Sequence, residues 1–191
     1  SSKSYAHRAL ICASFANGTT NITCPYTSED IQVTVDCLKA LGTTIARTKQ
    51  GFRVVPAKGQ NRPQSVKLNC KESGTTLRFL LPLLGALHVN ATISAEGRLF
   101  SRPLEPLISE LSAHGMSFTW LDEKFLEVSG QLTSGLFELP GDISSQFISG
   151  LLLSLPLLSE SSTIQITGPI QSKDYLVITE QIMTDFGVCA T

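Results

Sequence analysis

Short groups of hydroxyl, amide and cationic side chains recur along the sequence, and each stands directly before an apolar run. If each run is a helix, the group lies at its N-terminus, where unpaired N–H groups and the positive end of the helix dipole attract anions. The pattern therefore predicts a binding site for phosphate or carboxylate. The groups are Lys3-Ser4 with Arg8, Gly74-Thr75 with Arg78, and Ser144-Ser145-Gln146.

Two further helix starts place a cation after a serine, in Ser101-Arg102 and Ser172-Lys173. Ser28-Glu29-Asp30 carries no cation and is typical of an ordinary acidic helix start, so we leave it out of the expected site. A single serine of this kind is more often a helix cap than a ligand. Because groups of hydroxyl, amide and cationic side chains recur at equivalent helix starts in three copies, we favour anion binding over simple capping.

The equivalence rests on an internal repeat of about 71 residues. Ser2, Ser73 and Ser144 are spaced 71 residues apart, and so are Ile22, Ile93 and Ile164. Glycines close the second apolar stretch of each copy at Gly42, Gly115 and Gly187. We expect one domain over residues 1–191, with repeats at about 1–60, 61–133 and 134–191, of which the first and last are incomplete.

Each copy predicts the order strand, helix, strand, helix, strand, strand. The first helix is expected at about 4–16, 75–87 and 146–157, and it is apolar nearly all round. A second helix should follow a serine cap, with the stripe Leu104, Leu107, Ile108 and Leu111 as its buried face in the second copy. A hairpin of 116–121 and 125–129 should come next. The predicted class is α/β (α+β), with pseudo-threefold symmetry.

Composition excludes several classes of function. Fifteen Lys and Arg against 16 Asp and Glu give a net charge of -1, which argues against nucleic acid or an anionic membrane as partner. The longest apolar stretches, 79–87 and 147–158, fall short of the roughly 20 residues of a membrane span. Five scattered cysteines predict reduced thiols in a cytoplasmic protein, and no residue spacing indicates a metal or a cofactor.

The remaining candidates are weaker. His7, His88 and His114 are unrelated in repeat position, and we expect them to be structural or exposed. Phe118 and Trp120 alternate on a strand and are expected in the core. Neither a phosphate-binding P-loop motif nor a nucleophile-elbow motif is present.

In order and spacing, the groups resemble the enolpyruvyl transferases, and within them the branch that acts on shikimate 3-phosphate. The resemblance covers essentially the whole chain. It implies a fold of two similar domains, each built from three βαβαββ units as an inside-out α/β barrel, with only the N-terminal-side domain present here. The absent initiator Met and the stop at Thr191 inside a repeat agree with that expectation. The matching segments are Ser2-Lys3-Ser4 with Arg8, Ser73–Arg78, Arg102-Pro103, Ser144–Gln146 and Ser172–Tyr175.

The resemblance implies transfer of the enolpyruvyl group of phosphoenolpyruvate to the 5-hydroxyl of shikimate 3-phosphate. Lys3 would act at the reaction centre, Tyr175 would line the site, and Arg78 would buttress the Gly74 loop. The catalytic carboxylates would come from the second domain, so we expect this chain alone to bind weakly and not to turn over. The implied phosphoenolpyruvate ligands are Lys3, Gly74, Arg102 and Gln146. The implied shikimate 3-phosphate ligands are Lys3, Ser4, Arg8, Ser144, Ser145, Gln146 and Ser172.

Two alternatives stay open from the sequence. The branch that uses UDP-N-acetylglucosamine resembles this chain in fold, but it typically has Asn in place of Ser4 and a reactive Cys shortly before the Arg-Pro pair. Here Arg98-Leu99-Phe100-Ser101 precede Arg102, so the shikimate branch is favoured. The other alternative is a non-catalytic repeat domain whose polar helix ends mediate assembly.

Overall fold

The apolar runs that follow the hydroxyl-rich groups form helices that are buried on most sides. The computed structural model describes residues 3–57 and 62–190. Its first helix of each copy is α1 (Lys3–Phe15), α3 (Gly74–Leu87) or α5 (Ser145–Ser154, extended by the 3-10 turn Leu155–Leu157). The three predicted first helices are therefore confirmed.

The second helix of each copy is α2 (Glu29–Ala40), α4 (Leu107–Ala113) or α6 (Lys173–Asp185). The glycines expected to stop these helices, Gly42, Gly115 and Gly187, all have positive φ. A left-handed residue just past the last turn is a common helix end, and glycine adopts it without steric cost.

The strands form three small sheets. The middle sheet has the order β4-β5-β7-β6, in which β4 runs parallel to β5 while β7 is antiparallel to β5 and β6. Leu68 lies opposite Ile93, and Ile93 lies opposite Leu126, so buried side chains face the helices. The strands are β4 (Ser65–Asn69), β5 (Asn90–Ser94), β6 (Met116–Trp120) and β7 (Phe125–Gly130).

The two outer sheets each repeat part of this pattern. The order β1-β3-β2 is antiparallel throughout and matches β5-β7-β6, whereas β8 and β9 pair in parallel, as β4 and β5 do. The chain order in the middle copy is β4, α3, β5, α4, β6, β7, the predicted βαβαββ unit. The strands are β1 (Thr20–Thr23), β2 (Thr44–Arg47), β3 (Gly51–Val55), β8 (Leu136–Pro140) and β9 (Thr163–Thr167).

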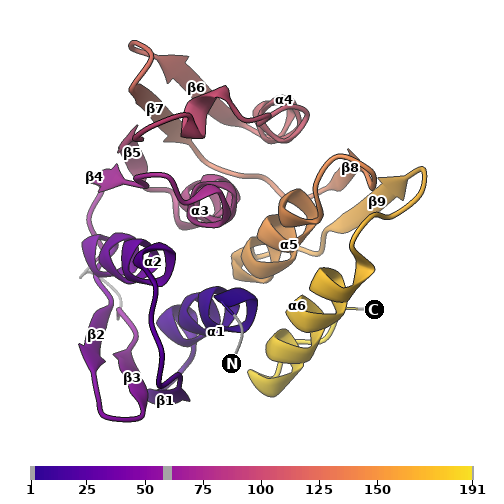
Figure 1. The fold of residues 1–191 in the computed structure, drawn as a ribbon. Helices are drawn as coiled ribbons and strands as arrows, with labels where there is room; N and C mark the ends of the chain where they lie inside the picture. The colour runs from indigo at the N-terminus through magenta and orange to yellow at the C-terminus, as the bar shows by residue number, and fades with distance from the viewer. Residues whose placement is uncertain (1–2, 58–61, 191) are drawn as a thin grey trace.

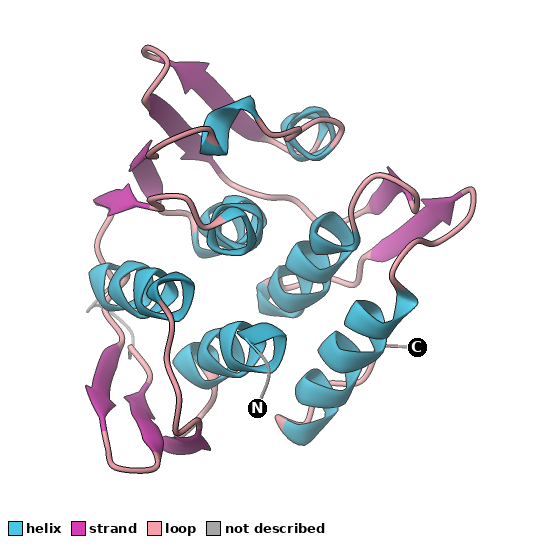
Figure 2. Cartoon of the chain, viewed as in Figure 1, coloured by secondary structure: helices cyan, strands magenta, loops and turns pink. Residues whose placement is uncertain are grey.

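Helices fill the middle of the molecule and the sheets lie outside, one for each copy (Figures 1 and 2). Helix α3 packs against α5, α5 against α6, and α1 against both α2 and α6. Phe79 and Phe147 are fully buried between them. This inside-out arrangement brings helix starts from different copies close together.

Two expectations were wrong in the middle copy. Ser101 does not cap a helix, because the chain forms a short 3-10 turn at Leu99–Ser101 and α4 begins only at Leu107. Arg102 precedes Pro103 and has extended backbone (ψ 144), as the proline ring requires of the residue before it. Trp120 is 47% exposed rather than buried in the core, and it packs edge-on against Phe100.

No helix in residues 3–57 and 62–190 is long and apolar enough to cross a bilayer. Cys37 and Cys70 are buried, whereas Cys189 is exposed. A hydrogen bond with Cys37, followed by burial, raises the pKa of the Cys70 thiol well above its ordinary value. A thiol of this kind stays protonated and behaves as a small core residue.

Candidate functional site

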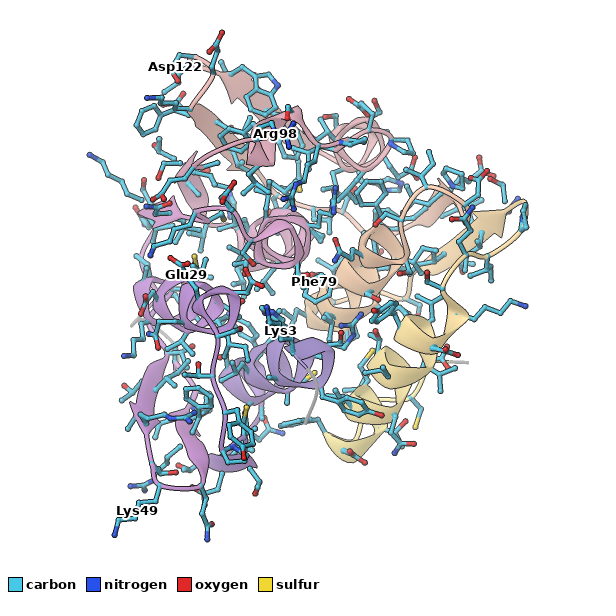
Figure 3. All side chains as sticks on the ribbon, viewed as in Figure 1. Lys3, Glu29, Lys49, Phe79, Arg98 and Asp122 are labelled. Carbon is cyan, nitrogen blue, oxygen red and sulfur yellow. The ribbon has the colours of Figure 1, made fainter. Side chains whose placement is uncertain are left out.

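A cavity of about 410 Å³ opens where the starts of helices from all three copies meet. Its walls come from α1, α2, α3, α5 and α6, and Lys3 lies where α1 faces α2 and α3 (Figure 3). The structure brings together every residue expected to hold shikimate 3-phosphate. These cavity-lining residues are Lys3, Ser4, Arg8, Ser144, Ser145, Gln146 and Ser172.

Arg8 is a buried cation without a carboxylate partner. Its side chain is 2% exposed, and in the described part of the chain it forms no ion pair. Nε donates to Thr179 Oγ1 (2.6 Å) and Nη2 to Ser149 Oγ (2.9 Å), while Nη1 donates to the Ser4 carbonyl (3.0 Å). Burial lowers the Arg8 pKa to about 10. A charge held this way by neutral oxygens remains free to attract an anion into the cavity.

Lys3 reaches across the cavity to α2. Its Nζ forms an ion pair with Asp30 Oδ2 at 2.9 Å. The exclusion of Ser28-Glu29-Asp30 from the site was therefore wrong for Asp30, which also lines the cavity. Both side chains are substantially exposed, at 60% and 41%, so the pair is weak and a bound anion can compete for Lys3.

Both polar atoms of the Gln146 side-chain amide make hydrogen bonds. Its Oε1 accepts from Arg78 Nη1 (2.7 Å), and its Nε2 donates to Thr75 Oγ1 (2.9 Å). Arg78 also donates to the Pro103 carbonyl (3.0 Å), which ties the start of α3 to the Arg102 segment. Burial, followed by the nearby Arg102 charge, lowers the Arg78 pKa. Thr75, which belongs to the predicted Gly74-Thr75 group but not to the ligands implied by the resemblance, thus orients a predicted ligand.

Gly74 and Arg102 lie beside this cluster rather than in the cavity wall. A Cβ on Gly74 would stand 3.3 Å from Arg102 Nη1 and 3.4 Å from Arg78 Nη1. The bare glycine therefore leaves a small space between two guanidinium groups at the start of α3. Two guanidinium groups beside the backbone N–H groups of a helix start are donors of the kind that bind phosphate.

The serines at the helix starts do not all have the same task. Ser144 Oγ accepts from the Gln146 N–H (3.3 Å) and so caps α5. Ser172 stands at the N-cap position of α6 but makes no side-chain cap bond, and its backbone is left-handed (φ 58). Its hydroxyl is exposed toward the cavity region and is not needed to hold the helix.

His7, which we expected to be structural or exposed, also lines the cavity. It is 3% exposed, and its Nδ1 lies 2.7 Å from Thr34 Oγ1 on α2. Burial lowers its pKa to about 4, with Asp30 opposing and Arg8 and Lys3 adding to the shift. The ring is therefore neutral near pH 7. His88 is exposed, and His114 stacks on Phe137 (3.8 Å) away from the cavity.

A larger hollow of about 850 Å³ lies elsewhere, between the 95–101 loop and the β6–β7 hairpin. Arg98 and Asp122 mark its place in Figure 3. Its cations Arg98 and Lys124 are offset by Glu96, Asp122 and Glu123, so it offers no net attraction for anions. We therefore assign the anion site to the smaller cavity, where helix starts and cations coincide.

The profile of the EPSP synthase (3-phosphoshikimate 1-carboxyvinyltransferase) family matches residues 1–190. The chain belongs to this family. It is 42% identical over 191 residues to the 3-phosphoshikimate 1-carboxyvinyltransferase of Clostridium kluyveri, and 39% identical over 191 residues to that of Clostridium perfringens. Each alignment covers 98% of this chain and 44% of the relative.

Solved structures agree with this assignment. EPSP synthase from Acinetobacter baumannii matches with a TM-score of 0.81 and 25% identity, covering 100% of this chain and 43% of that one. The predicted resemblance and the enolpyruvyl transferase type of fold are therefore confirmed. The chain spans about half the length of the EPSP synthase family members it matches.

The cavity holds many cations and few acids. Asp30 is the only carboxylate among its lining residues in the described ranges, and Lys3 already pairs with it. No group of three or more His, Cys, Asp or Glu in those ranges is placed to hold a metal ion. The chemistry available here is the binding of anions by helix starts, guanidinium groups and hydroxyls.

Proposed function

We propose that this chain forms one half of the substrate site of an enzyme that transfers the enolpyruvyl group of phosphoenolpyruvate to shikimate 3-phosphate. The observation that carries the proposal is the buried Arg8 cation, which has no carboxylate partner in the described residues and lies among converging helix starts. Membership of the EPSP synthase family supports the choice of substrates.

The roles proposed for individual residues are those that the family resemblance implies, and the position of each residue in or beside the cavity supports them. Ser4, Arg8, Ser144, Ser145 and Ser172 hold shikimate 3-phosphate through hydroxyls and one cation. Gly74 and Arg102 hold phosphoenolpyruvate beside α3, while Lys3 and Gln146 contact both substrates. Hydrogen bonds to a charged group are stronger than hydrogen bonds between neutral groups, and they fix the orientation of a bound anion.

In the proposed reaction the 5-hydroxyl oxygen of shikimate 3-phosphate forms a bond to C2 of phosphoenolpyruvate and gives up its proton to a base, while C3 gains a proton from an acid. Phosphate then leaves C2 with cleavage of the C–O bond, and C3 loses a proton to restore the double bond. Lys3 acts at the reacting centre, where its ammonium group stabilises developing negative charge. Residues 1–191 form one domain of three repeats, and a second domain of the cytoplasmic enzyme supplies the remaining clamps and acid–base groups.

Calorimetric titration of this chain with shikimate 3-phosphate tests the proposal. We expect binding, and we expect Ser172→Ala to weaken it about tenfold to a hundredfold through loss of one hydrogen bond to a charged group. The variant should unfold at the same urea concentration as the parent, because the Ser172 side chain does not cap α6. Ser117→Ala, at an exposed serine of β6 outside the cavity, is the matched control.

Three results separate the alternatives. Binding of shikimate 3-phosphate that Ser172→Ala weakens and Ser117→Ala does not supports the proposal. Tighter binding of UDP-N-acetylglucosamine would move the chain to the sister branch. A chain that binds neither ligand at millimolar concentration would favour the assembly function instead.

A further inference from the structure

Four buried polar side chains link α1, α2 and α3 in one continuous hydrogen-bond chain. His7 Nδ1 lies 2.7 Å from Thr34 Oγ1, which lies 2.7 Å from Thr76 Oγ1, which lies 2.7 Å from Ser73 Oγ. All four side chains are at most 3% exposed. We call this set the buried polar chain.

The protons of the buried polar chain can be placed by elimination. Each hydroxyl has one hydrogen to donate, and Ser73 Oγ already accepts from the Thr76 N–H (3.4 Å) as the cap of α3. If Ser73 donates to Thr76, Thr76 to Thr34 and Thr34 to His7 Nδ1, every hydroxyl hydrogen is used. In the opposite direction, the Ser73 hydrogen would have no acceptor among the four members.

A buried hydroxyl hydrogen without an acceptor costs about 1–3 kcal/mol, so the first direction is favoured. His7 Nδ1 is then an acceptor, and the ring proton sits on Nε2. An acceptor nitrogen requires a neutral ring, which agrees with the lowered His7 pKa of about 4. The facing charges are Asp30 on α2 and Lys3 and Arg8 on α1.

The ends of the buried polar chain lie beside the anion site. His7 is one turn from Lys3 and directly before Arg8 on α1, while Ser73 and Thr76 enclose Gly74 and Thr75 at the start of α3. Helix α2, which carries Thr34, packs against both α1 and α3. The buried polar chain therefore bridges the two helix starts that contribute most cations to the cavity.

We propose that His7, Thr34 and Thr76 are positioning residues, which hold the starts of α1 and α3 at the spacing that shikimate 3-phosphate requires. They act through Lys3, Ser4, Arg8 and Thr75; of the three, only His7 borders the cavity itself. The affinity part of this inference rests on the proposed function, because it takes shikimate 3-phosphate as the ligand. The geometric part stands on the hydrogen bonds alone.

Thr34→Val tests the inference because it removes one hydroxyl and keeps the shape of the side chain. Thr34→Ser restores the hydroxyl, and Thr43→Val is the matched control. Thr43 is equally buried (3% exposed), but its Oγ1 has no hydrogen-bond partner. Its replacement should leave the site unchanged and should not lower the urea midpoint.

Two measurements on the same 191-residue chain are needed. In calorimetry, Thr34→Val should weaken binding of shikimate 3-phosphate about tenfold, while Thr34→Ser should bind within about twofold of the parent. The chain has three His, so the ring signals in nitrogen-detected NMR are few. We expect His7 to show one tautomer, with its proton on Nε2. Thr34→Val should mix the tautomers and shift the amide signals of Ser4 and Thr75, and Thr43→Val should do neither.

The two measurements keep the inference separate from the proposed function. If the parent chain binds no shikimate 3-phosphate, the proposed function fails, and the NMR signals of Ser4 and Thr75 still decide the geometric part. Shifts in Thr34→Val that Thr34→Ser reverses support the buried polar chain as a positioning device. Unchanged affinity and unchanged amide signals in Thr34→Val, or an Nδ1–H tautomer of His7, would overturn it.

Discussion

At the scale of single residues, the site depends on ionisable groups kept away from water. Arg8 is held by Thr179, Ser149 and the Ser4 carbonyl, and it packs 5.0 Å from the Phe79 ring centroid. Thr179 and Ser149 lie 171 and 141 residues away from Arg8 in the sequence. Burial of the guanidinium lowers the stability of the fold, because the group loses its hydration. The same burial strengthens the local electrostatic attraction for a phosphate.

His7 gives the protein a defined sensitivity to acid. Its pKa falls from the ordinary value of 6.5 to about 4 on folding, so the unfolded chain binds a proton between these values that the folded chain does not. The contribution of neutral His7 to the free energy of unfolding is fully present above pH 6.5 and is lost as the pH falls toward 4. Across that window the loss should be on the order of 3 kcal/mol.

Urea unfolding between pH 7 and pH 4.5 checks this expectation. In His7→Asn the amide can still meet Thr34 but does not titrate, so the pH dependence should become shallower. His88→Asn is the control, because His88 is exposed and its left-handed backbone (φ 53) suits asparagine. An equal change of slope in both variants would contradict the assignment to His7.

At the scale of helices and strands, the close approach of α3 and α5 positions the site. Gly150 on α5 sits where an added Cβ would stand 2.8 Å from the Arg78 carbonyl and 3.3 Å from Pro82 Cγ. Any side chain there must push α5 away from α3. The push would separate Gln146 from Arg78 and Thr75, the contacts that orient its amide.

Gly150→Ala should therefore destabilise the protein, although alanine is the better helix former. The helix propensity gain is about 1 kcal/mol, whereas overpacking a rigid backbone contact costs about 1–3 kcal/mol and also disturbs binding. Gly18→Ala is the control, since nothing lies within 4 Å of its added Cβ. Urea midpoints of the two variants test this, and a Gly150→Ala chain as stable as Gly18→Ala would refute the packing argument.

The repeat pattern allowed most elements to be predicted because helix caps, β-branched runs and stop glycines are local signals. The late start of α4 was missed, since the stripe Leu104–Leu111 outweighed the constraint that Pro103 places on Arg102. Asp30 was missed for a different reason. Its role comes from the packing of α1 on α2, and no local pattern carries that information.

At the scale of the whole molecule, the cavity supplies half of what the proposed chemistry needs. It offers Lys3, Arg8 and Arg78 as cations, but among its described lining residues the only carboxylate is Asp30. Addition to phosphoenolpyruvate needs a proton donor and a base in place at the same time. Asp30 is already paired to Lys3 at 2.9 Å, so the cavity offers no uncommitted carboxylate among its described lining residues.

We therefore expect the 191-residue chain to bind shikimate 3-phosphate and to release no phosphate from phosphoenolpyruvate. Joined to the remaining part of the Clostridium kluyveri relative, which shares 42% identity with this chain, it should release phosphate when both substrates are present. Lys3→Met in the joined protein should abolish release, whereas Ser117→Ala should not. Turnover by the 191-residue chain alone would show that the acid–base groups lie within it, and the division of labour proposed for the two halves would be wrong.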